Sequence, residues 1–560
     1  MAVDILGIIT LPNWLCCALA TLLAVCLYTW YKQSLFRRLG IPTKKTVFLL
    51  GDFVDMVRGG FSYLGMDLYK RYGKVFGIYL GNVPALVISD PEIIKHIMVK
   101  DFDHFTDRPP FMKLTKFWKS ALTVADGNVW RNIRHTISPT FTSGKLRNMT
   151  QFLQRSLDVF HDILERKIKD SPTGFDFDPN MVDESIEVVG LDGSFATSKL
   201  TAVCKYCRYA MVITSQHPGM ITIGLYTASD VRCYTMDVIC SIGFGLDVSA
   251  QTNPDNPFIK YSKRVLETSP AGMPKFILYI LFPDLADMFP RFFETSVLSK
   301  DILDFFLTTT RSLFEDRKQS ESKHKDLLQL MVNASYLAET EKVSDNQRKG
   351  LTDEEILINS IIFMLAGYDT TAAGISWVLY ELALNPEIQE KLVTAIDDEI
   401  GESPLSYDNV FSLKYMDMVL SETLRVHAPA TRLVRMPDRD TEISGIKIPK
   451  GMTCNFVTDI LHFLDEYWED PYSFNPERFA PENKDKINEY AYLPFGVGPR
   501  NCVGMRLAQL EVKMTVISIL RKYKIFKGSE LKVPLPRSPY GLARPGAPVY
   551  LRFELRGRNT

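Results

Sequence analysis

The stretch FGVGPRNCVG, residues 495–504, places a single cysteine, Cys502, among three glycines and an arginine. Nine cysteines in 560 residues do not indicate a disulfide framework. Zinc and iron–sulfur sites take several cysteines or histidines at short spacing, and the sequence around Cys502 supplies no second one. A lone thiolate in such a loop can serve as a nucleophile or as the single axial ligand of a haem iron.

The neighbours of Cys502 favour haem ligation. Backbone N–H groups of a glycine-rich loop, and the N-terminus of a helix that we expect from Val503, would both stabilise a thiolate. Arg500 can pair with a haem propionate, and Phe495 can lie against the porphyrin. These features explain the composition of the loop better than a nucleophilic role does.

A long helix is predicted over residues 353–384. Thr352 and Glu355 form a capping-box pattern at its start, and Pro386 marks its far end. Its middle, LAGYDTTAAG (365–374), has small and polar residues where leucines would normally pack. Threonines there can bond to the carbonyl four residues back and open a notch in the helix face. The same small residues would equally allow a second helix to pack closely.

Further helices are expected at 146–169, 297–318, 386–400 and 503–522, and strands at 76–89, 442–458 and 548–555, with Gly81-Asn82 as a hairpin signal. No proline- or glycine-rich linker separates these elements. We therefore predict a mainly α protein with small β-sheets, in which one large domain spans residues 32–560.

Five segments, in order along the chain, resemble the signature motifs of the cytochrome P450 superfamily. The phrases FTDRPPF (105–111), PTFTSGKLRNM (139–149) and FMLAGYDTTA (363–372) are similar to the microsomal clan of family 3 monooxygenases and thromboxane synthase. The five motifs are the Cys502 loop, Trp130-x-x-x-Arg134, Ala366-Gly-Tyr-Asp-Thr-Thr371, Glu422-x-x-Arg425 and Asn475-Pro-Glu-Arg-Phe479.

The resemblance implies a haem b cofactor, iron protoporphyrin IX, whose iron is bound by Cys502. It implies that Asp369 and Thr370 organise proton delivery through water, and that Glu422, Arg425 and Arg478 stabilise the fold without chemistry. The other residues that it places around the haem are Phe495 against the porphyrin and Arg500, Trp130, Arg134, Arg108 and Arg435 near the propionates.

The implied activity is a haem-thiolate monooxygenase that inserts one oxygen atom of O2 into a lipophilic substrate. Electrons would come from NADPH through cytochrome P450 reductase, because no Gly-x-Gly-x-x-Gly unit is present, and cytochrome b5 is a further candidate donor. Two alternatives stay open. A thromboxane synthase-type isomerase would rearrange a peroxide without the Asp369–Thr370 pair, and an insertion in the chain could leave an inactive haem protein.

The N-terminus predicts a membrane anchor over residues 1–31. The run LPNWLCCALATLLAVCLYTW (11–30) is long enough to span a bilayer, has aromatic residues near both ends, and is followed by Lys32, Arg37 and Arg38. A cleaved signal peptide is the alternative, but its charges would precede the apolar run. We expect a single-pass protein of the endoplasmic reticulum with a cytosolic domain. The net charge of −1 argues against a nucleic-acid partner.

The segment 182–231 departs from the family pattern, in which GFDFDPN (174–180) runs almost directly into YTMDVICSIGFG (234–245). Cys204 and Cys207 form a Cys-x-x-Cys, but without a second pair nearby in the sequence we expect no metal site. We interpret the segment as an inserted surface loop or as an unspliced stretch of a gene model. Its lack of a sustained period favours the second interpretation.

Overall fold

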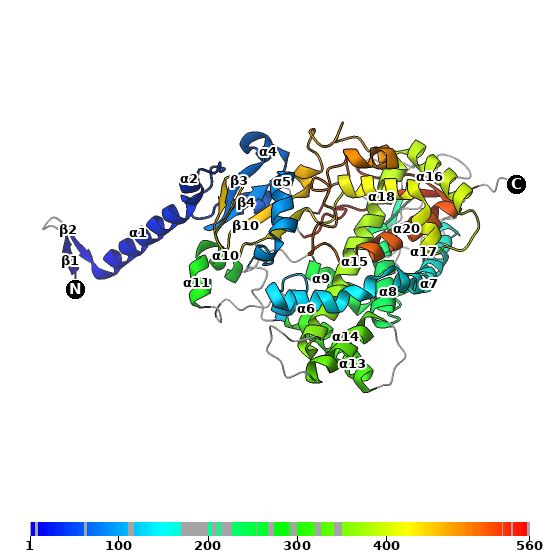
Figure 1. The fold of residues 1–560 in the computed structure, drawn as a ribbon, viewed down its shortest axis with the longest axis horizontal. Coiled ribbons are helices and arrows are strands. Elements are labelled where there is room, and N and C mark those ends of the chain that lie inside the picture. The colour runs from blue at the N-terminus through cyan, green and yellow to red at the C-terminus, as the bar shows by residue number, and fades with distance from the viewer. Residues whose placement is uncertain are drawn as a thin grey trace.

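The computed structural model shows a helical domain with small sheets on one side and an N-terminal helix that projects away from it (Figure 1). This confirms the predicted fold class. The structure describes residues 2–5, 9–60, 64–109, 117–169, 200–203, 210–213, 227–253, 255–266, 274–289, 292, 299–319, 326–340, 350–528, 530–538 and 541–556.

Helix α15 (Asp353–Leu384) is the central element, and its bounds are those predicted. The capping box forms: the Thr352 N–H donates to Glu355 Oε2 at 2.8 Å, and the Glu355 N–H donates to Thr352 Oγ1 at 3.2 Å. Helix α8 (Thr227–Phe244) packs along α15 more extensively than any other described element. A Cβ on Gly367 would come within 2.7 Å of Ile239 Cγ1 on α8. The small residues of α15 therefore do serve close helix packing at this point.

Helices α6, α7, α8, α14, α16, α17, α18 and α20 bury the largest apolar cluster together with α15. Helices α3, α4, α5 and α10 pack in smaller clusters near the sheet (Figure 1). Four of the predicted helices are confirmed within a few residues at each end, as α7, α13, α16 and α20. The bounds are α3 Phe53–Gly59, α4 Met66–Tyr72, α5 Pro91–Lys95, α6 Gly127–Ile137, α7 Ser143–Lys169, α9 Pro257–Leu266, α10 Pro274–Leu281, α11 Pro283–Met288, α13 Lys300–Gln319, α14 Leu327–Thr340, α16 Pro386–Glu399, α17 Tyr407–Ser412, α18 Lys414–Val426, α19 Thr458–Leu461 and α20 Met505–Lys522.

The largest sheet has the strand order β3-β4-β10-β7. Strands β3 (Val75–Leu80) and β4 (Val83–Ile88) form the predicted hairpin, in which Gly81 has the positive φ of 63° that favours glycine. Strand β10 (Thr453–Val457) runs parallel to β4 and antiparallel to β7 (Arg432–Arg435), with Cys454 opposite Arg435. The sheet thus fixes the position of Arg435. The other pairs are β1 Ala2–Ile5 with β2 Ile9–Pro12, β5 Leu200–Val203 with β6 Ala210–Ile213, β8 Thr441–Ile443 with β9 Ile446–Ile448, and β11 Tyr523–Lys527 with β12 Leu551–Leu555.

Most of the segment 182–231 lies outside the described residues, and so do Cys204 and Cys207. Within it the structure describes the β5–β6 hairpin and the first residues of α8. Helix α8 ends at Phe244, so it contains nearly all of the family-like stretch 234–245.

Helix α1 (Asn13–Gln33) continues almost directly into α2 (Leu35–Leu39). Residues 13–39 are long and apolar enough to cross a membrane, and nearly all of this span is exposed. Helix α15 also meets that criterion, but most of it is buried as a core helix. Only the C-terminal end of α1 contacts the domain: the Tyr28 hydroxyl donates to Asp284 at 2.9 Å, Lys32 pairs with Asp284 at 2.8 Å, and Gln33 donates to the Gly81 carbonyl at 3.1 Å.

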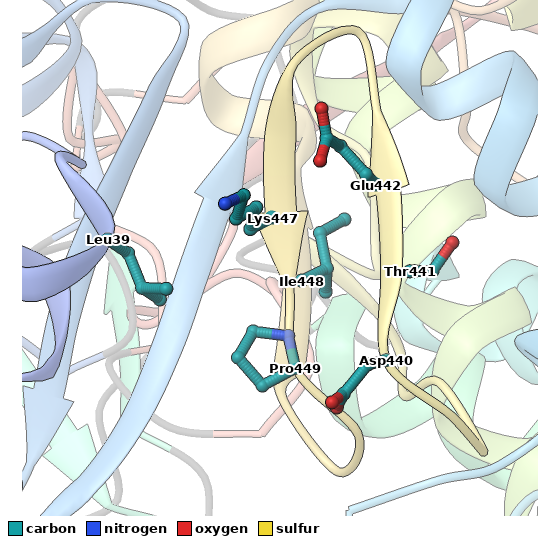
Figure 2. A pocket seen from close by; sticks show the side chains of 7 residues that line it. All are labelled: Leu39, Asp440, Thr441, Glu442, Lys447, Ile448 and Pro449. Carbon is teal, nitrogen blue, oxygen red and sulfur yellow. The ribbon is translucent and has the colours of Figure 1, made fainter.

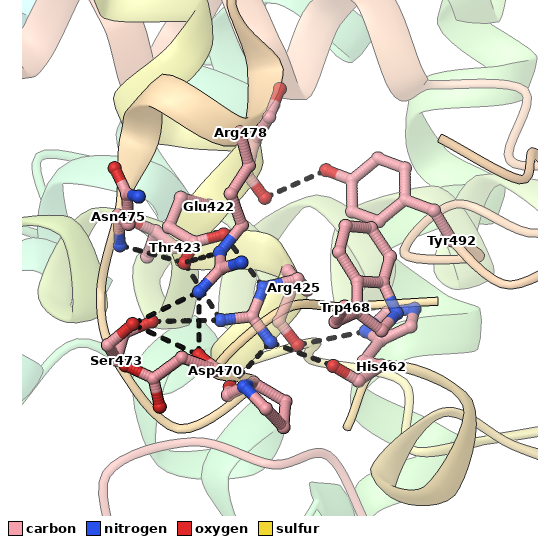
Figure 3. A network of polar contacts seen from close by, with 12 residues as sticks. Glu422, Thr423, Arg425, His462, Trp468, Asp470, Ser473, Asn475, Arg478 and Tyr492 are labelled. Atoms are coloured by element: carbon pink, nitrogen blue, oxygen red, sulfur yellow. Dashed lines mark hydrogen bonds and ion pairs between the residues drawn. The ribbon is translucent and has the colours of Figure 1, made fainter. Parts of the chain in front are cut away.

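A buried ion-pair network joins α18 to the segment 469–478 (Figure 3). Glu422 and Arg425 are both fully buried, and the Arg425 guanidinium donates to the two carboxylate oxygens at 2.7 and 2.8 Å. Arg478 donates to Glu422 at 3.3 Å. Arg425 also donates to the carbonyls of His462 and Pro471, both at 2.8 Å. The geometry supports the structural role expected of these residues.

We predict that Arg425→Met lowers the free energy of unfolding by about 3–5 kcal/mol, because Glu422 would remain buried without its main partner. Chemical denaturation of the purified protein measures this change. The matched control is Arg147→Met, which removes an exposed 2.7 Å ion pair with Asp408 and should change stability little. Equal effects of the two substitutions would contradict the prediction.

Candidate active site

The loop before α20 is folded tightly around Cys502. The Cys502 N–H donates to the Phe495 carbonyl at 2.8 Å, and the Asn501 N–H donates to the Gly498 carbonyl at 3.0 Å. Gly498 has φ +74°, and a Cβ there would lie 2.0 Å from the Met98 carbonyl oxygen. Only glycine allows this approach, so the glycines of the loop serve its backbone geometry.

Cys502 lines a cavity, and its side chain is exposed there although protein surrounds it. Burial raises the pKa of the Cys502 thiol, while the Gly504 N–H and the charge of Arg134 lower it. The predicted backbone donor is thus present. Helix α20 begins at Met505 rather than Val503, because Gly504 occupies the N-cap position. Binding of a cation at the sulfur would complete the stabilisation of the thiolate.

The cavity at Cys502 has a volume of about 250 Å³. Thr370 from α15 and Phe495 and Arg500 from the loop line it together with Cys502, so four of the predicted site residues meet at one space. The other lining residues are mostly apolar: Thr371, Gly374, Leu420, Leu424, Pro429, Ala430, Leu433, Pro494, Ala508, Gln509 and Val512.

A second hollow of about 390 Å³ lies at the surface between Leu39 and the β8–β9 hairpin (Figure 2). Its polar side chains are Thr441 and Glu442 on β8, Lys447 on β9, and Asp440 just before β8. It includes none of the site residues predicted from the sequence. The cavity at Cys502 is therefore the candidate active site.

Three arginines cluster beside the loop with open hydrogen-bond donors. Within the described residues, Nε of Arg108, Nε of Arg435, and Nε and Nη1 of Arg500 are buried and have no hydrogen-bond partner. Burial lowers the pKa of Arg500 to about 9 and that of Arg108 to about 10. Burial and repulsion from Arg108 and Arg500 also lower the pKa of Arg435. Buried cations with free donors form a site for anionic groups, and the two propionates of a haem fit it.

The sequence placed Trp130 and Arg134 among the propionate contacts, and this stays a prediction; within the protein itself both residues also have partners in the Cys502 loop. The Arg500 guanidinium lies over the Trp130 ring, 4.7 Å from its centroid. Arg134 donates to the Asn501 carbonyl at 2.9 Å and to Asn501 Oδ1 at 2.7 Å. Trp130 therefore supports Arg500, and Arg134 holds the Cys502 loop. The role of Asn501 was not predicted, although it adjoins the cysteine.

Thr370 and Asp369 lie on different sides of α15. The Thr370 hydroxyl donates to the Ala366 carbonyl at 2.7 Å, as predicted, and Thr370 lines the cavity. Asp369 is 1 % exposed and does not line the cavity. Its carboxylate accepts from Arg232 at 2.9 Å and from Arg544 at 2.8 Å. No signal in the sequence indicated these arginines, which lie 137 and 175 residues from Asp369.

Comparison with known proteins agrees with this geometry. The family model for cytochrome P450 matches residues 41–190 and 214–553, and its unmatched gap lies inside the segment 182–231. Cytochrome P450 3A13 of Mus musculus is 33% identical over 99% of this chain and 98% of its own. Cytochrome P450 3A9 of Rattus norvegicus and cytochrome P450 3A5 of Homo sapiens are each 34% identical, with the same coverage. The chain belongs to the cytochrome P450 family of haem-thiolate monooxygenases.

Proposed function

We propose that this protein is a membrane-anchored monooxygenase that takes electrons from NADPH through a separate reductase and oxidises a lipophilic substrate. One observation carries the proposal: Cys502 and Thr370 face the same cavity, beside three buried arginines with open donors. Cys502 would bind the haem iron, and Arg108, Arg435 and Arg500 would bind the propionates. When bound, a thiolate-ligated haem supplies the chemistry of dioxygen activation.

The protein groups around the cavity have separate tasks in this proposal. The lining is mostly apolar, which favours a lipophilic substrate and excludes bulk water. The Thr370 hydroxyl is the polar group of α15 placed to hold a water in the cavity. Asp369 stands one residue behind it, between Arg232 and Arg544, and would pass protons to that water only when one of these ion pairs opens.

Membrane attachment is proposed from the N-terminal helix. The exposed α1 would cross the bilayer. Contacts of its C-terminal end with Asp284 and Gly81 would hold the domain close to the point where the helix leaves the bilayer. Tyr28 and Lys32 are residue types that prefer the membrane–water interface. The positive residues that follow the span support a proposed position of the domain on the cytosolic side of the endoplasmic reticulum.

We predict that Cys502→His removes the red-shifted Soret band of the reduced carbon monoxide complex, because the band requires an axial thiolate. An absorption difference spectrum of the purified variant measures it. Cys454→Ser, which changes a buried cysteine of β10, is the control and should retain the band. A band that survives in Cys502→His would show that another cysteine binds the iron.

Thr370→Ala should continue to consume NADPH in the presence of reductase while yielding less oxidised product and more hydrogen peroxide. Asp369→Asn should slow turnover by roughly 100-fold, because the titratable group is lost. Product, peroxide and NADPH are measured together in one assay. The control is Ser376→Ala, because the Ser376 hydroxyl also donates to the carbonyl four residues back, at 2.8 Å, but Ser376 does not line the cavity. An isomerase that acts on a ready-made peroxide needs neither group, so two silent variants would replace the monooxygenase proposal with that alternative.

Protease added to intact microsomes should digest the domain and leave a short membrane-protected fragment that contains α1. Immunoblotting with tags at each end measures this, and detergent-treated microsomes provide the control. Protection of the whole domain until detergent is added would place it in the lumen and contradict the proposed topology.

A further inference from the structure

His462 is fully buried and lies beside Arg425 and Trp468 (Figure 3). Its ring Nδ1 is 2.9 Å from the carbonyl oxygen of Arg425, the last residue but one of α18. Its ring Nε2 is 2.9 Å from the backbone nitrogen of Leu493. One imidazole therefore bridges two backbone groups that are 68 residues apart by their numbers, 425 and 493.

The two partners determine the protonation of the ring. A carbonyl oxygen can only accept, so Nδ1 must carry the hydrogen. A backbone N–H can only donate, so Nε2 must be free to accept. His462 is therefore a neutral imidazole in one tautomer. Burial lowers the pKa of His462 to about 3, and the charges of Arg425 and Arg537 act in the same direction, which agrees with that assignment.

The contact with α18 is reciprocal. Arg425 donates from its guanidinium to the His462 carbonyl at 2.8 Å, while His462 donates from its ring to the Arg425 carbonyl. Aromatic side chains enclose the pair: the Tyr492 ring is 5.5 Å from the His462 ring, and the Trp468 N–H donates to the Leu461 carbonyl at 2.9 Å. The imidazole thus has a fixed place relative to the ion-pair network.

From Leu493 the hydrogen bonds continue into the Cys502 loop. The Leu493 carbonyl accepts from the Gly496 N–H at 3.1 Å, and the Phe495 carbonyl accepts from the Cys502 N–H at 2.8 Å. Leu493 is itself fully buried. His462 thus links the Arg425 backbone to the first residues of the loop, beside a second link in which the Tyr492 hydroxyl donates to the Ser421 carbonyl of α18 at 2.9 Å.

We propose that His462 is a positioning residue for the axial ligand: by bridging Arg425 and Leu493 it sets where the Cys502 loop begins relative to α18. The part of this inference that concerns the iron rests on the proposed function of Cys502. Glutamine can replace the bridge, because its amide carries a donor and an acceptor, whereas leucine offers neither.

The test compares the full-length variants His462→Leu and His462→Gln with wild type. Hydrogen exchange with mass spectrometry measures the exchange rates of the Leu493, Gly496 and Cys502 amides. The carbon monoxide difference spectrum reports whether the Cys502 thiolate is bound to the iron. The matched control is His161→Leu, another buried histidine, which bonds Ser518 at 2.6 Å. Ser518 lies 13 residues past Met505, where α20 begins, so His161 acts about 20 Å along the helix from the end of the loop.

We expect His462→Leu to speed exchange of the three loop amides about tenfold, as the loss of one buried hydrogen bond implies, and to convert part of the red-shifted Soret band into the shorter-wavelength form. His462→Gln should restore both, and His161→Leu should leave the loop amides unchanged. Unaltered loop exchange in His462→Leu, or an equal effect of His161→Leu, would overturn the proposal.

If His462→Leu does not fold, His462→Gln tests the proposal alone. The proposal then requires the loop amides of His462→Gln to exchange as slowly as in wild type, and faster exchange would overturn it. Failure of the haem assignment is distinguishable from failure of this inference. If the haem assignment is wrong, Cys502→His would keep the red-shifted band. Exchange of the loop amides in the His462 variants would still show whether the imidazole bridges Arg425 and Leu493.

Discussion

The buried ion pair between Glu422 and Arg425 is the interaction through which the cysteine loop is placed. Burial of a charged side chain costs desolvation free energy, which is offset only when the group is paired and fully hydrogen bonded. Arg425 meets this condition by donating to Glu422 and to the carbonyls of residues 462, 471 and 473. Those carbonyls belong to a long irregular segment that has little regular structure of its own. Hydrogen bonds from the guanidinium thereby hold this segment against α18. The His462 ring extends this set of hydrogen bonds by accepting from the Leu493 N–H.

A second constraint acts at the cavity itself. Arg108, Arg435 and Arg500 lie close together in a buried region. Burial, together with repulsion between these arginines, lowers the pKa of Arg435 and of Arg500. Pairing of β7 with β10 fixes Arg435, and the Trp130 ring packs against Arg500. Backbone carbonyls accept some of the hydrogen bonds that the arginines donate. Such a cluster costs free energy in the protein alone and is compensated by an anionic ligand. Stability and cofactor binding are therefore coupled at this site.

Local chemistry explains what the sequence predicted correctly. The capping box at Thr352 starts α15, and Pro386 follows its end. Both signals act on neighbouring residues in the chain, so the bounds of α15 could be predicted from the sequence. The Gly81-Asn82 turn likewise defines one hairpin. Contacts between distant segments could not be found in this way. The parallel pairing of β10 with β4 and the two arginines on Asp369 depend on how the whole chain folds. The motif that contains Arg134 gives residue types and not partners, so it did not predict the hydrogen bonds of Arg134 to Asn501.

The central claim is that Cys502 and the surrounding arginines form a haem-thiolate site. Iron K-edge X-ray absorption of the purified full-length protein tests it most directly, because it reports the atoms bound to the metal. The account predicts four nitrogen ligands from a porphyrin and one sulfur ligand at the iron. An iron coordinated by nitrogen and oxygen alone, in protein that retains its native fold, would contradict it.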